Sequence, residues 1–569
     1  MSLPRIDRRA LVILSLITFV LCGEVGLNAR PVDSDEWIRL TGSDFVVFSN
    51  ASELTAREIA TEFANFRATV EAILPALEHR PLRPIHVYIF RNGKTFRQFR
   101  PDNPRIAGYF FGTPTINYIA MDATSREPAP VIRHEYVHYL LSNNFPYMPR
   151  WLGEGLAHYF EGFRVARGEA HVGLFVGPMQ RYLRFSGDWM PMEELLSIAH
   201  GSDACRDPKK MMQFRAEAWA LVHYLFVPTE ERRQRASRMF ALLSDGVPSD
   251  RALAEAFEMS LPKLQKALRK HIRSPLAPHA VFPLDELNAD TDFSIGRMKR
   301  LDILCRLGDL LVKGSEKQTE HARRYFDEAL TSSPDHPPAL VGKAELLYRQ
   351  GEHKVAQTHL RRALDRQPSN AITHFLLGIT LLGQFEEEDG QVPPRGGSTS
   401  TLVVQAREAF RRAFEIDPFF VAAYNNYGHT YIFDATSRQP GIDVVTRALM
   451  RFPSLSLALT LLELHSRNGD TETARQIHGE HIEKMMGTLG GHEDAAFVEM
   501  ETAILRADLL VAQAWIEQGR RDEALTLLRE TRSKASDDEL RRDIDRKLED
   551  YAKADPKGSD HPIPPSPDK

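Results

Sequence analysis

A set of small and apolar residues recurs at a nearly fixed period in the second half of the chain, and this repeat constrains the fold more than any other feature. A small residue, an apolar residue, an alanine and a proline return 34, then 50, then 35 positions later. The copies are Ala322, Phe326, Ala329 and Pro334; Ala356, Leu360, Ala363 and Pro368; Ala406, Phe410, Ala413 and Pro418; and Gly441, Val445, Ala448 and Pro453. The extra residues before the third copy fall between Glu386 and Ser400, where Gly, Pro, Ser and acidic residues predict a loop.

This repeat predicts pairs of packed helices. Small side chains let two helices approach closely, and a proline ends the second helix of each pair. A 34-residue period with these features resembles the tetratricopeptide repeat. The resemblance implies an all-α solenoid over residues 296–550, with a concave groove that binds a protein partner or presents a substrate. An irregular helical array is the alternative, but it would not keep four positions in register through four copies.

The region from residue 38 to residue 275 has a mixed pattern. Apolar and alternating runs predict strands at Phe45–Phe48 and Ile85–Phe90, and a hairpin of Tyr109–Phe111 with Ile116–Ile119. Residues 54–76 have helical periodicity, and after about residue 130 the pattern is helical throughout. The sequence therefore predicts an α+β domain with its strands early and its helices late.

The two ends of the chain differ from these domains. Three arginines precede an apolar run at residues 10–22, which is short for a membrane span, so residues 1–29 resemble an export signal. An uncleaved anchor is the alternative, with membrane association through residues 10–22. Either interpretation predicts an exported protein of the bacterial periplasm or cell envelope. The proline-rich tail at residues 555–569 is predicted to be disordered.

The residues that can carry chemistry lie between Pro128 and Gly162. Pro130 suits the first turn of a helix that contains the HExxH motif at residues 134–138. At 3.6 residues per turn, His134 and His138 lie on one face and can reach one metal ion. Glu135 flanks that ion without having to bind it, as a general base for a metal-bound water does. A helix that carries two histidines and no metal is the alternative interpretation.

A second helix follows between Pro149 and Gly162. A helix, a short loop and a returning helix would place Glu154 opposite the two histidines. Two imidazoles and one carboxylate leave a fourth position open for water, which is the usual layout of a catalytic zinc site. Gly153 and Gly155 flank Glu154 and predict that these two helices pack closely.

The HExxH run together with the segment Trp151-Leu152-Gly153-Glu154-Gly155-Leu156-Ala157 resembles the gluzincin clan of zinc metallopeptidases. It is most similar to the bacterial peptidase-MA-like families of the DUF1570 type, over roughly residues 40–230. The resemblance implies a gluzincin-like α+β domain with one Zn²⁺ per chain, bound by His134, His138 and Glu154, and Glu135 as the catalytic base. The interval between His138 and Glu154 is shorter than in well-studied relatives, which leaves the helix geometry open.

A peptidase also needs a group that stabilises the oxyanion. His158 lies one helical turn after Glu154, where a residue supporting the metal ligands would sit. His223 shares a helix face with Arg215 and Trp219 and is a second candidate. Either histidine could instead be purely structural.

Composition excludes several other functions. Lys and Arg number 72 against 77 Asp and Glu, a net charge of −5 that gives no support to nucleic-acid binding. The sequence has no GxxxxGK[ST] phosphate loop, so no nucleotide cofactor is predicted. Three cysteines cannot form a disulfide framework or a cysteine zinc site, although Cys205 and Cys305 could pair.

Two functions from different classes follow. The first is an exported zinc metallopeptidase that hydrolyses a peptide or protein substrate and whose repeats recruit a partner. The second is a non-catalytic interaction protein of the cell envelope, in which the repeats act and the metal site is structural or silent. A zinc hydrolase of non-peptide amides is a third option, because the same activated water would serve.

Overall fold

The computed structural model describes residues 32–74, 83–101, 106–125, 128–145, 148–174, 177–185, 188–198, 207–226, 229–273, 279–390, 397–434, 436–482, 505, 508–509, 511–513, 515–516, 519–535 and 538–553. The predicted export segment 1–29, the predicted tail 555–569 and Cys205 lie outside these ranges. Cys305 is buried and free. Within the described ranges, no helix combines the length and the apolar character that crossing a membrane requires.

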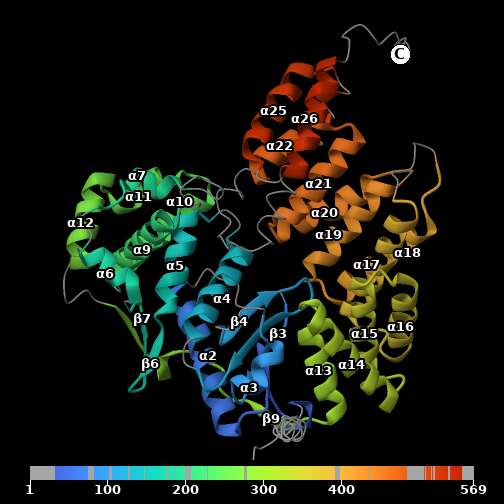
Figure 1. Cartoon of the computed structure of the whole chain (residues 1–569). Helices are drawn as coiled ribbons and strands as arrows, with labels where there is room; N and C mark the ends of the chain where they lie inside the picture. Colours follow the sequence, from blue (N-terminus) through green and yellow to red (C-terminus); the bar gives the residue numbers. More distant parts are fainter. Residues whose placement is uncertain are drawn as a thin grey trace, which may run out of the picture.

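Six strands form a mixed sheet in the order β4-β5-β3-β2-β1-β9 (Figure 1). Their bounds are β1 Ile38–Thr41, β2 Phe45–Ser49, β3 Ile85–Phe90, β4 Gly108–Gly112, β5 Asn117–Asp122 and β9 Ser294–Arg297. The central strands β2, β3 and β5 are parallel, and β4, β1 and β9 pair antiparallel. The predicted strands and the β4–β5 hairpin are confirmed, whereas β1 and β9 were not predicted. Strand β9 returns the chain to this sheet beyond residue 275.

One face of the sheet packs against helices of the first half. Val47, Val87 and Ile119 belong to a core with α2 (Glu53–Ile73) and α4 (Pro128–Asn144). Helix α2 begins after Ser52, whose side chain accepts a hydrogen bond from the Thr55 backbone N–H. Because successive side chains of a strand point to opposite faces, the neighbours of these residues face the other way.

The other face of the sheet packs against the first repeat helices. Phe48, Tyr88 and Tyr118 form one core with α13 (Arg300–Leu311) and α14 (Glu316–Ser332). The Tyr88 hydroxyl donates to the Arg306 carbonyl at 3.1 Å. The repeat region is therefore built onto the sheet through a shared core and is not a module on a free linker.

Beyond residue 130 the structure contains strands as well as helices, so the prediction that this part is wholly helical is wrong. Strands β6 (Arg164–Ala166), β7 (Glu169–Val172) and β8 (Ala280–Pro283) form a second antiparallel sheet. Arg167 and Gly168 join β6 to β7, both with positive φ (54° and 78°). A two-residue turn of this kind usually carries Asn-Gly or Asp-Gly, and Arg-Gly gives a weaker sequence signal.

Helices complete the first half on one side of the six-stranded sheet (Figure 1). They are α5 Arg150–Glu161, α6 Gly177–Phe185, α7 Met192–Ser197, α9 Pro208–Leu225, α10 Glu230–Ser244, α11 Ser249–Phe257 and α12 Leu261–Arg273. The short α3 (Gly93–Phe96) lies beside β3, and its Phe96 belongs to the core that the sheet shares with α13 and α14. Helix α4 packs against α5, and α5 packs against α9; these three helices carry the residues of the candidate site.

The repeat region is helical, as predicted. Its helices after α13 and α14 are α15 Pro337–Arg349, α16 His353–Arg366, α17 Ala371–Glu388, α18 Thr401–Ile416, α19 Val421–Thr430, α20 Gln439–Arg451, α21 Leu455–Asn468, α22 Thr471–Ile477, α25 Arg521–Lys534 and α26 Asp538–Lys553. The repeated small and apolar residues are buried on α14, α16, α18 and α20, and each repeated proline lies two residues beyond the end of its helix. The first half is thus an α+β region with a mixed sheet, followed by tetratricopeptide-like helices.

Candidate metal centre

Helix α4 carries the HExxH motif, whose two histidines lie on a different side of the helix from the core residues between them. Tyr136 and Val137 are fully buried, while His134 and His138 are half-buried. The two Nε2 atoms lie 3.2 Å apart, and the ring centroids are 4.8 Å apart. Two nitrogens bound to one tetrahedral zinc ion at about 2.0–2.1 Å lie about 3.3 Å apart, so this pair has the spacing that a shared ion requires.

Helix α5 returns beside α4 and brings in Glu154, as predicted. Glu154 is completely buried. Its Oε1 lies 3.8 Å from His138 Nε2, and its Oε2 lies 3.8 Å from His158 Nε2 and 3.6 Å from Arg215 Nε on α9. Among the residues that the structure describes, neither carboxylate oxygen has a hydrogen-bond partner. Arg215 compensates the charge of this carboxylate in part, but its two buried oxygens still lack the hydrogen bonds or the metal ion that would replace their lost hydration.

The electrostatic environment keeps Glu154 ionised. Burial alone would raise the pKa of Glu154, but the facing His138, His134 and His158 and the Arg215 guanidinium outweigh it and lower the pKa to about 2. Ionised carboxylates are the form that binds a metal ion. The charge at the centre of the site is therefore already set for a cation.

His158 belongs to the same group of facing side chains as His134, His138 and Glu154, whereas the sequence predicted it as a residue that supports the metal ligands. Its ring centroid is 4.4 Å from that of His134, and its buried Nε2 has no hydrogen-bond partner within the described ranges. One ligand atom each from His134, Glu154 and His158 lie within 4.8 Å of one another, a group that could hold a metal ion. Together with His138, the site presents three imidazoles and one carboxylate.

Glu161, which the sequence did not single out, orients two of these rings. Its Oε2 lies 2.5 Å from His158 Nδ1 and 3.7 Å from His134 Nδ1. Burial would raise the pKa of Glu161, but the hydrogen bond with His158 and the nearby His134 outweigh it and lower the pKa to about 2. A carboxylate on Nδ1 fixes the tautomer that leaves Nε2 available for a metal. The spacing of three residues from His158 on one helix is the sequence signal that could have identified Glu161.

We expect Glu161→Ala to weaken zinc binding about 10–100-fold, because the imidazoles lose the group that orients them. Competition with a chelator of known affinity measures the change. Glu62→Ala is the matched control: Glu62 pairs with Arg133 on α4 at 2.6 Å, next to His134, without contacting a candidate ligand. Equal zinc affinity in the Glu161→Ala and wild-type chains would contradict the orienting role.

The two glycines beside Glu154 act differently from the prediction. A Cβ at Gly155 would lie 2.5 Å from Val222 Cγ2 and 2.6 Å from the Ala218 carbonyl oxygen, both on α9. A Cβ at Gly153 would meet only Met148 Sδ, at an ordinary 3.9 Å. Gly155 therefore lets α5 approach α9, and not α4 as predicted. Sequence spacing alone could not identify which helix lies on that side.

Gly155→Ala is expected to lower the free energy of unfolding by about 1–3 kcal/mol, because its methyl group meets a backbone carbonyl that cannot move aside. Gly153→Ala, two positions away on the same helix, is the control and should be neutral or stabilising by up to about 1 kcal/mol through helix propensity. Urea unfolding followed by circular dichroism measures both. Similar unfolding curves for the two variants would contradict the close α5–α9 contact.

The remaining predicted residues lie as follows. Glu135 is half-buried on α4 between the two histidines, and its role as a base stays a prediction. His223 lies on α9 eight residues after Arg215, a rise of about 12 Å along the helix, and its Nδ1 is 2.9 Å from His271 Nε2. The structure therefore does not bring His223 to Glu154, although the shared helix face was predicted.

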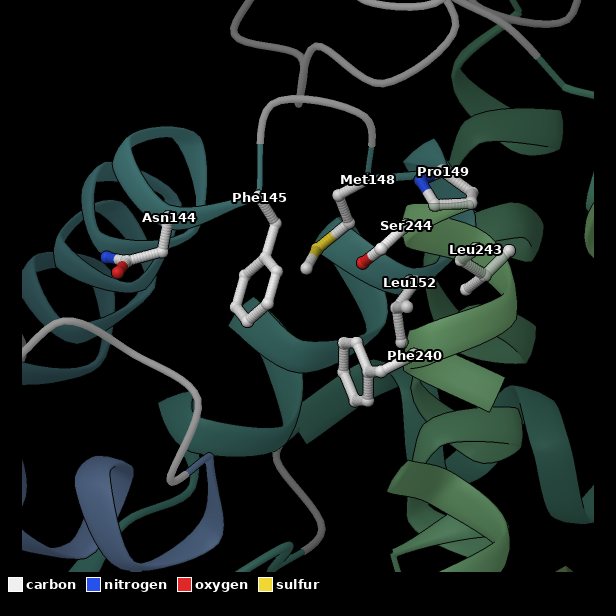
Figure 2. Close-up of a pocket in the computed structure, with 8 residues that line it drawn as sticks. All are labelled: Asn144, Phe145, Met148, Pro149, Leu152, Phe240, Leu243 and Ser244. Carbon is white, nitrogen blue, oxygen red and sulfur yellow. The ribbon is translucent and has the colours of Figure 1, made fainter. Parts of the chain in front are cut away.

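An apolar pocket of about 220 Å³ lies where α4 ends and α5 begins (Figure 2). Its lining residues are Asn144, Phe145, Met148, Pro149, Leu152, Phe240, Leu243 and Ser244. Leu152 precedes Glu154 by two residues, which places the two side chains on nearly opposite sides of α5. The pocket is therefore separate from the metal centre.

Family models match both halves of the chain. The model described as protein of unknown function (DUF1570) matches residues 129–249, and a tetratricopeptide-repeat model matches residues 315–378. The chain thus combines a DUF1570 domain, which contains the His and Glu group on α4 and α5, with tetratricopeptide repeats.

Individual relatives resemble only parts of the chain. The uncharacterized protein y4yS of Sinorhizobium fredii is 32% identical over 93 residues, which are 16% of this chain and 50% of that protein. IFIT1 homolog B of Homo sapiens is 29% identical over 103 residues, 17% of this chain and 22% of that protein. The chain therefore spans half or less of these relatives. The structure of pilF from Pseudomonas aeruginosa matches 43% of this chain and 97% of its own at 17% identity, with a TM-score of 0.31.

Proposed function

We propose that this chain is an exported zinc-dependent metallopeptidase. The observation that carries the proposal is the buried Glu154 carboxylate, which has no hydrogen-bond partner within the described residues and faces His138 and His158 at 3.8 Å each. A buried anion beside imidazole nitrogens is a donor set that suits zinc. The resemblance of the α4–α5 segment to gluzincins supports the same conclusion.

In this proposal His134, His138 and Glu154 hold the ion, as the HExxH spacing and the 3.2 Å separation of the two Nε2 atoms favour. Bound zinc would supply a Lewis acid and a water of lowered pKa for attack on a peptide carbonyl. Glu161 holds the rings of His134 and His158 in the orientation that leaves Nε2 available. Glu135 accepts the proton of the attacking water and delivers it to the departing amine.

His158 has a separate part in the proposal. Its Nδ1 is held by Glu161, so its Nε2 points toward Glu154 and the space beside the first two histidines. From there it can hydrogen-bond the substrate oxygen as negative charge develops, or act as a further ligand when no substrate is bound. Arg215 balances the charge of Glu154 from α9 and keeps the carboxylate in place.

The repeats would recruit a protein partner or present the substrate. Because α13 and α14 share a core with the six-stranded sheet, whose other face packs on α4, a chain bound by the repeats is held at a fixed position relative to the metal centre. The test is hydrolysis of denatured protein by the full chain and by Glu135→Gln, with zinc content measured on the same samples. Zinc-loaded protein that hydrolyses nothing would favour the non-catalytic interaction protein.

A further inference from the structure

The outward side of helix α12 carries four exposed cations at intervals of three, four and three residues. They are Lys263, Lys266, Lys270 and Arg273. This spacing places them along one side of the helix, and we call them the α12 basic row. The apolar residues with which α12 packs into the core lie on the opposite side; they are Leu264, Leu268 and Ile272.

Acidic residues do not neutralise the α12 basic row. Residues 261–273 contain no Asp and no Glu. Among the residues that the structure describes, none of the four cations forms an ion pair, not even with the exposed Glu193 and Glu194 on α7, which packs against α12. Exposed cations of the repeat helices are paired instead, as Arg362 is with Asp335 at 2.8 Å. The row is therefore a local excess of positive charge in a chain whose net charge is −5.

The α12 basic row does little to stabilise its own helix. Successive members lie about one turn apart, and like charges at this spacing repel each other. Lys263 lies in the first turn, where the positive end of the helix dipole disfavours a cation. The dipole favours cations in the last turn, where Lys270 and Arg273 lie. Because the helix gains so little from the row, we infer that the row has a role outside the helix.

Further cations lie along the same helix. The guanidinium of Arg269 lies 5.6 Å from the centroid of the Trp189 ring. Arg232 on α10 acts on His271, and burial together with this cation lowers the pKa of His271. Arg269 and Arg232 therefore extend the positive charge along α12.

The position of α12 leaves the row open to a large partner. Helix α12 lies at the outer edge of the first half, on the side away from the repeat helices (Figure 1). Its apolar side packs against α6, α7, α9 and α11, so the basic row faces outward from that edge. From Lys263 to Arg273 the row extends over about 15 Å of helix. An extended surface can therefore approach the row without meeting the repeats.

We propose that the α12 basic row binds the surface of a membrane that contains anionic phospholipids. Clusters of about four to eight Lys and Arg are typical of protein segments that bind such lipids. Four separate charges in a line match several headgroups and not a single phosphate ion. The row includes no aromatic side chain that could stack on bases, which disfavours a nucleic acid as the partner.

The contact would be peripheral and electrostatic. Helix α12 exposes no large apolar side chain that could enter the hydrocarbon layer. Binding should therefore weaken as the salt concentration rises, because salt screens exposed charges. This inference goes beyond the proposed peptidase activity and does not depend on it.

The test measures flotation of the full-length chain with two kinds of vesicle: equal parts of phosphatidylglycerol and phosphatidylcholine, and phosphatidylcholine alone. The test variant combines Lys263→Gln, Lys266→Gln, Lys270→Gln and Arg273→Gln. It should bind the anionic vesicles at least tenfold more weakly than the wild type, since each Lys or Arg near such a surface contributes roughly a fivefold factor. The matched control removes four exposed cations of the repeat helices and should bind as the wild type does; it combines Lys317→Gln, Arg324→Gln, Arg349→Gln and Lys354→Gln. Every chain keeps residues 10–22, so binding through that run is the same in all of them.

A second variant separates charge from folding. Lys263→Arg, Lys266→Arg and Lys270→Arg together keep the charge and should preserve binding. The Gln variant should retain the wild-type circular dichroism, because Gln is a good helix former, and should act on a soluble substrate as the wild type does.

Two results would overturn the proposal. The first is equal binding of the wild type and the Gln variant to anionic vesicles, or of the wild type to both kinds of vesicle. The second is binding of the wild type to soluble double-stranded DNA and to neither kind of vesicle, with the DNA binding lost in the Gln variant. That second result would assign the α12 basic row to soluble polyanions.

Discussion

Replacing Glu154 with Gln will remove zinc from the α4–α5 centre and abolish hydrolysis. Glu154 is the fully buried carboxylate that faces His138, His158 and Arg215, and these neighbours outweigh burial and lower its pKa to about 2. The amide of Gln has the same shape but no charge, so the loss isolates the electrostatic contribution. We expect zinc affinity to fall by at least 100-fold, on the order of 3 kcal/mol of binding free energy, as measured by chelator competition.

Glu217→Gln is the matched control for this prediction. Glu217 is also buried, on the neighbouring α9, but burial raises its pKa to about 7 despite hydrogen bonds from the Met190 backbone and the Gln213 side chain. About half of this carboxyl is therefore protonated near pH 7, and among the described residues it faces no imidazole of the centre. Glu217→Gln should keep zinc at the wild-type level. If Glu154→Gln also keeps it, the ion is held by histidines alone.

The α4–α5 pair could be predicted because its signals are local. His134 and His138 are one turn apart on any helix, and the prolines and glycines near residues 130, 149 and 162 mark where two helices begin and end. The repeat helices were predictable for the same reason, since each repeated proline lies just beyond a helix end. These features depend on a few neighbouring residues and not on the rest of the fold.

The parts that escaped prediction depend on contacts between distant segments. Strand β9 pairs with β1 across more than 250 residues, and its four residues carry no alternating apolar pattern. Gly155 is explained only by the carbonyl of Ala218 on α9. The sequence predicted that His223 shares a helix face with Arg215. Only the structure shows that Arg215 is the residue that reaches the Glu154 carboxylate, so the axial rise along α9 separates His223 from that carboxylate.

His158 and Glu161 show most clearly what sequence spacing alone could not predict. Their spacing from Glu154 places them on successive turns of α5, yet spacing does not say whether they face α4 or α9. The 2.5 Å contact between His158 Nδ1 and Glu161 Oε2 and the approach of both residues to His134 settle the orientation.

Glu135→Gln should abolish peptide hydrolysis while zinc stays bound. The HExxH spacing puts Glu135 beside the two imidazoles without making it a ligand, so the variant loses a proton acceptor and not a metal donor. A positioned general base typically contributes about 10²–10⁴-fold to the rate. We expect the hydrolysis of denatured protein, measured by mass spectrometry of new termini, to fall by at least that factor at unchanged zinc content.

The outcome separates the two functions because zinc content and hydrolysis are measured on the same protein. Glu62→Gln is the control. Glu62 lies on α2 and pairs with Arg133, which is on the same helix as Glu135, so this variant should hydrolyse at the wild-type rate. If Glu135→Gln retains full activity, another group accepts the proton and the assignment of Glu135 is wrong. If the wild type binds zinc but cleaves nothing, and the Glu135→Gln chain rescues a strain that lacks the protein, the repeats carry the function and the α4–α5 centre is structural or silent.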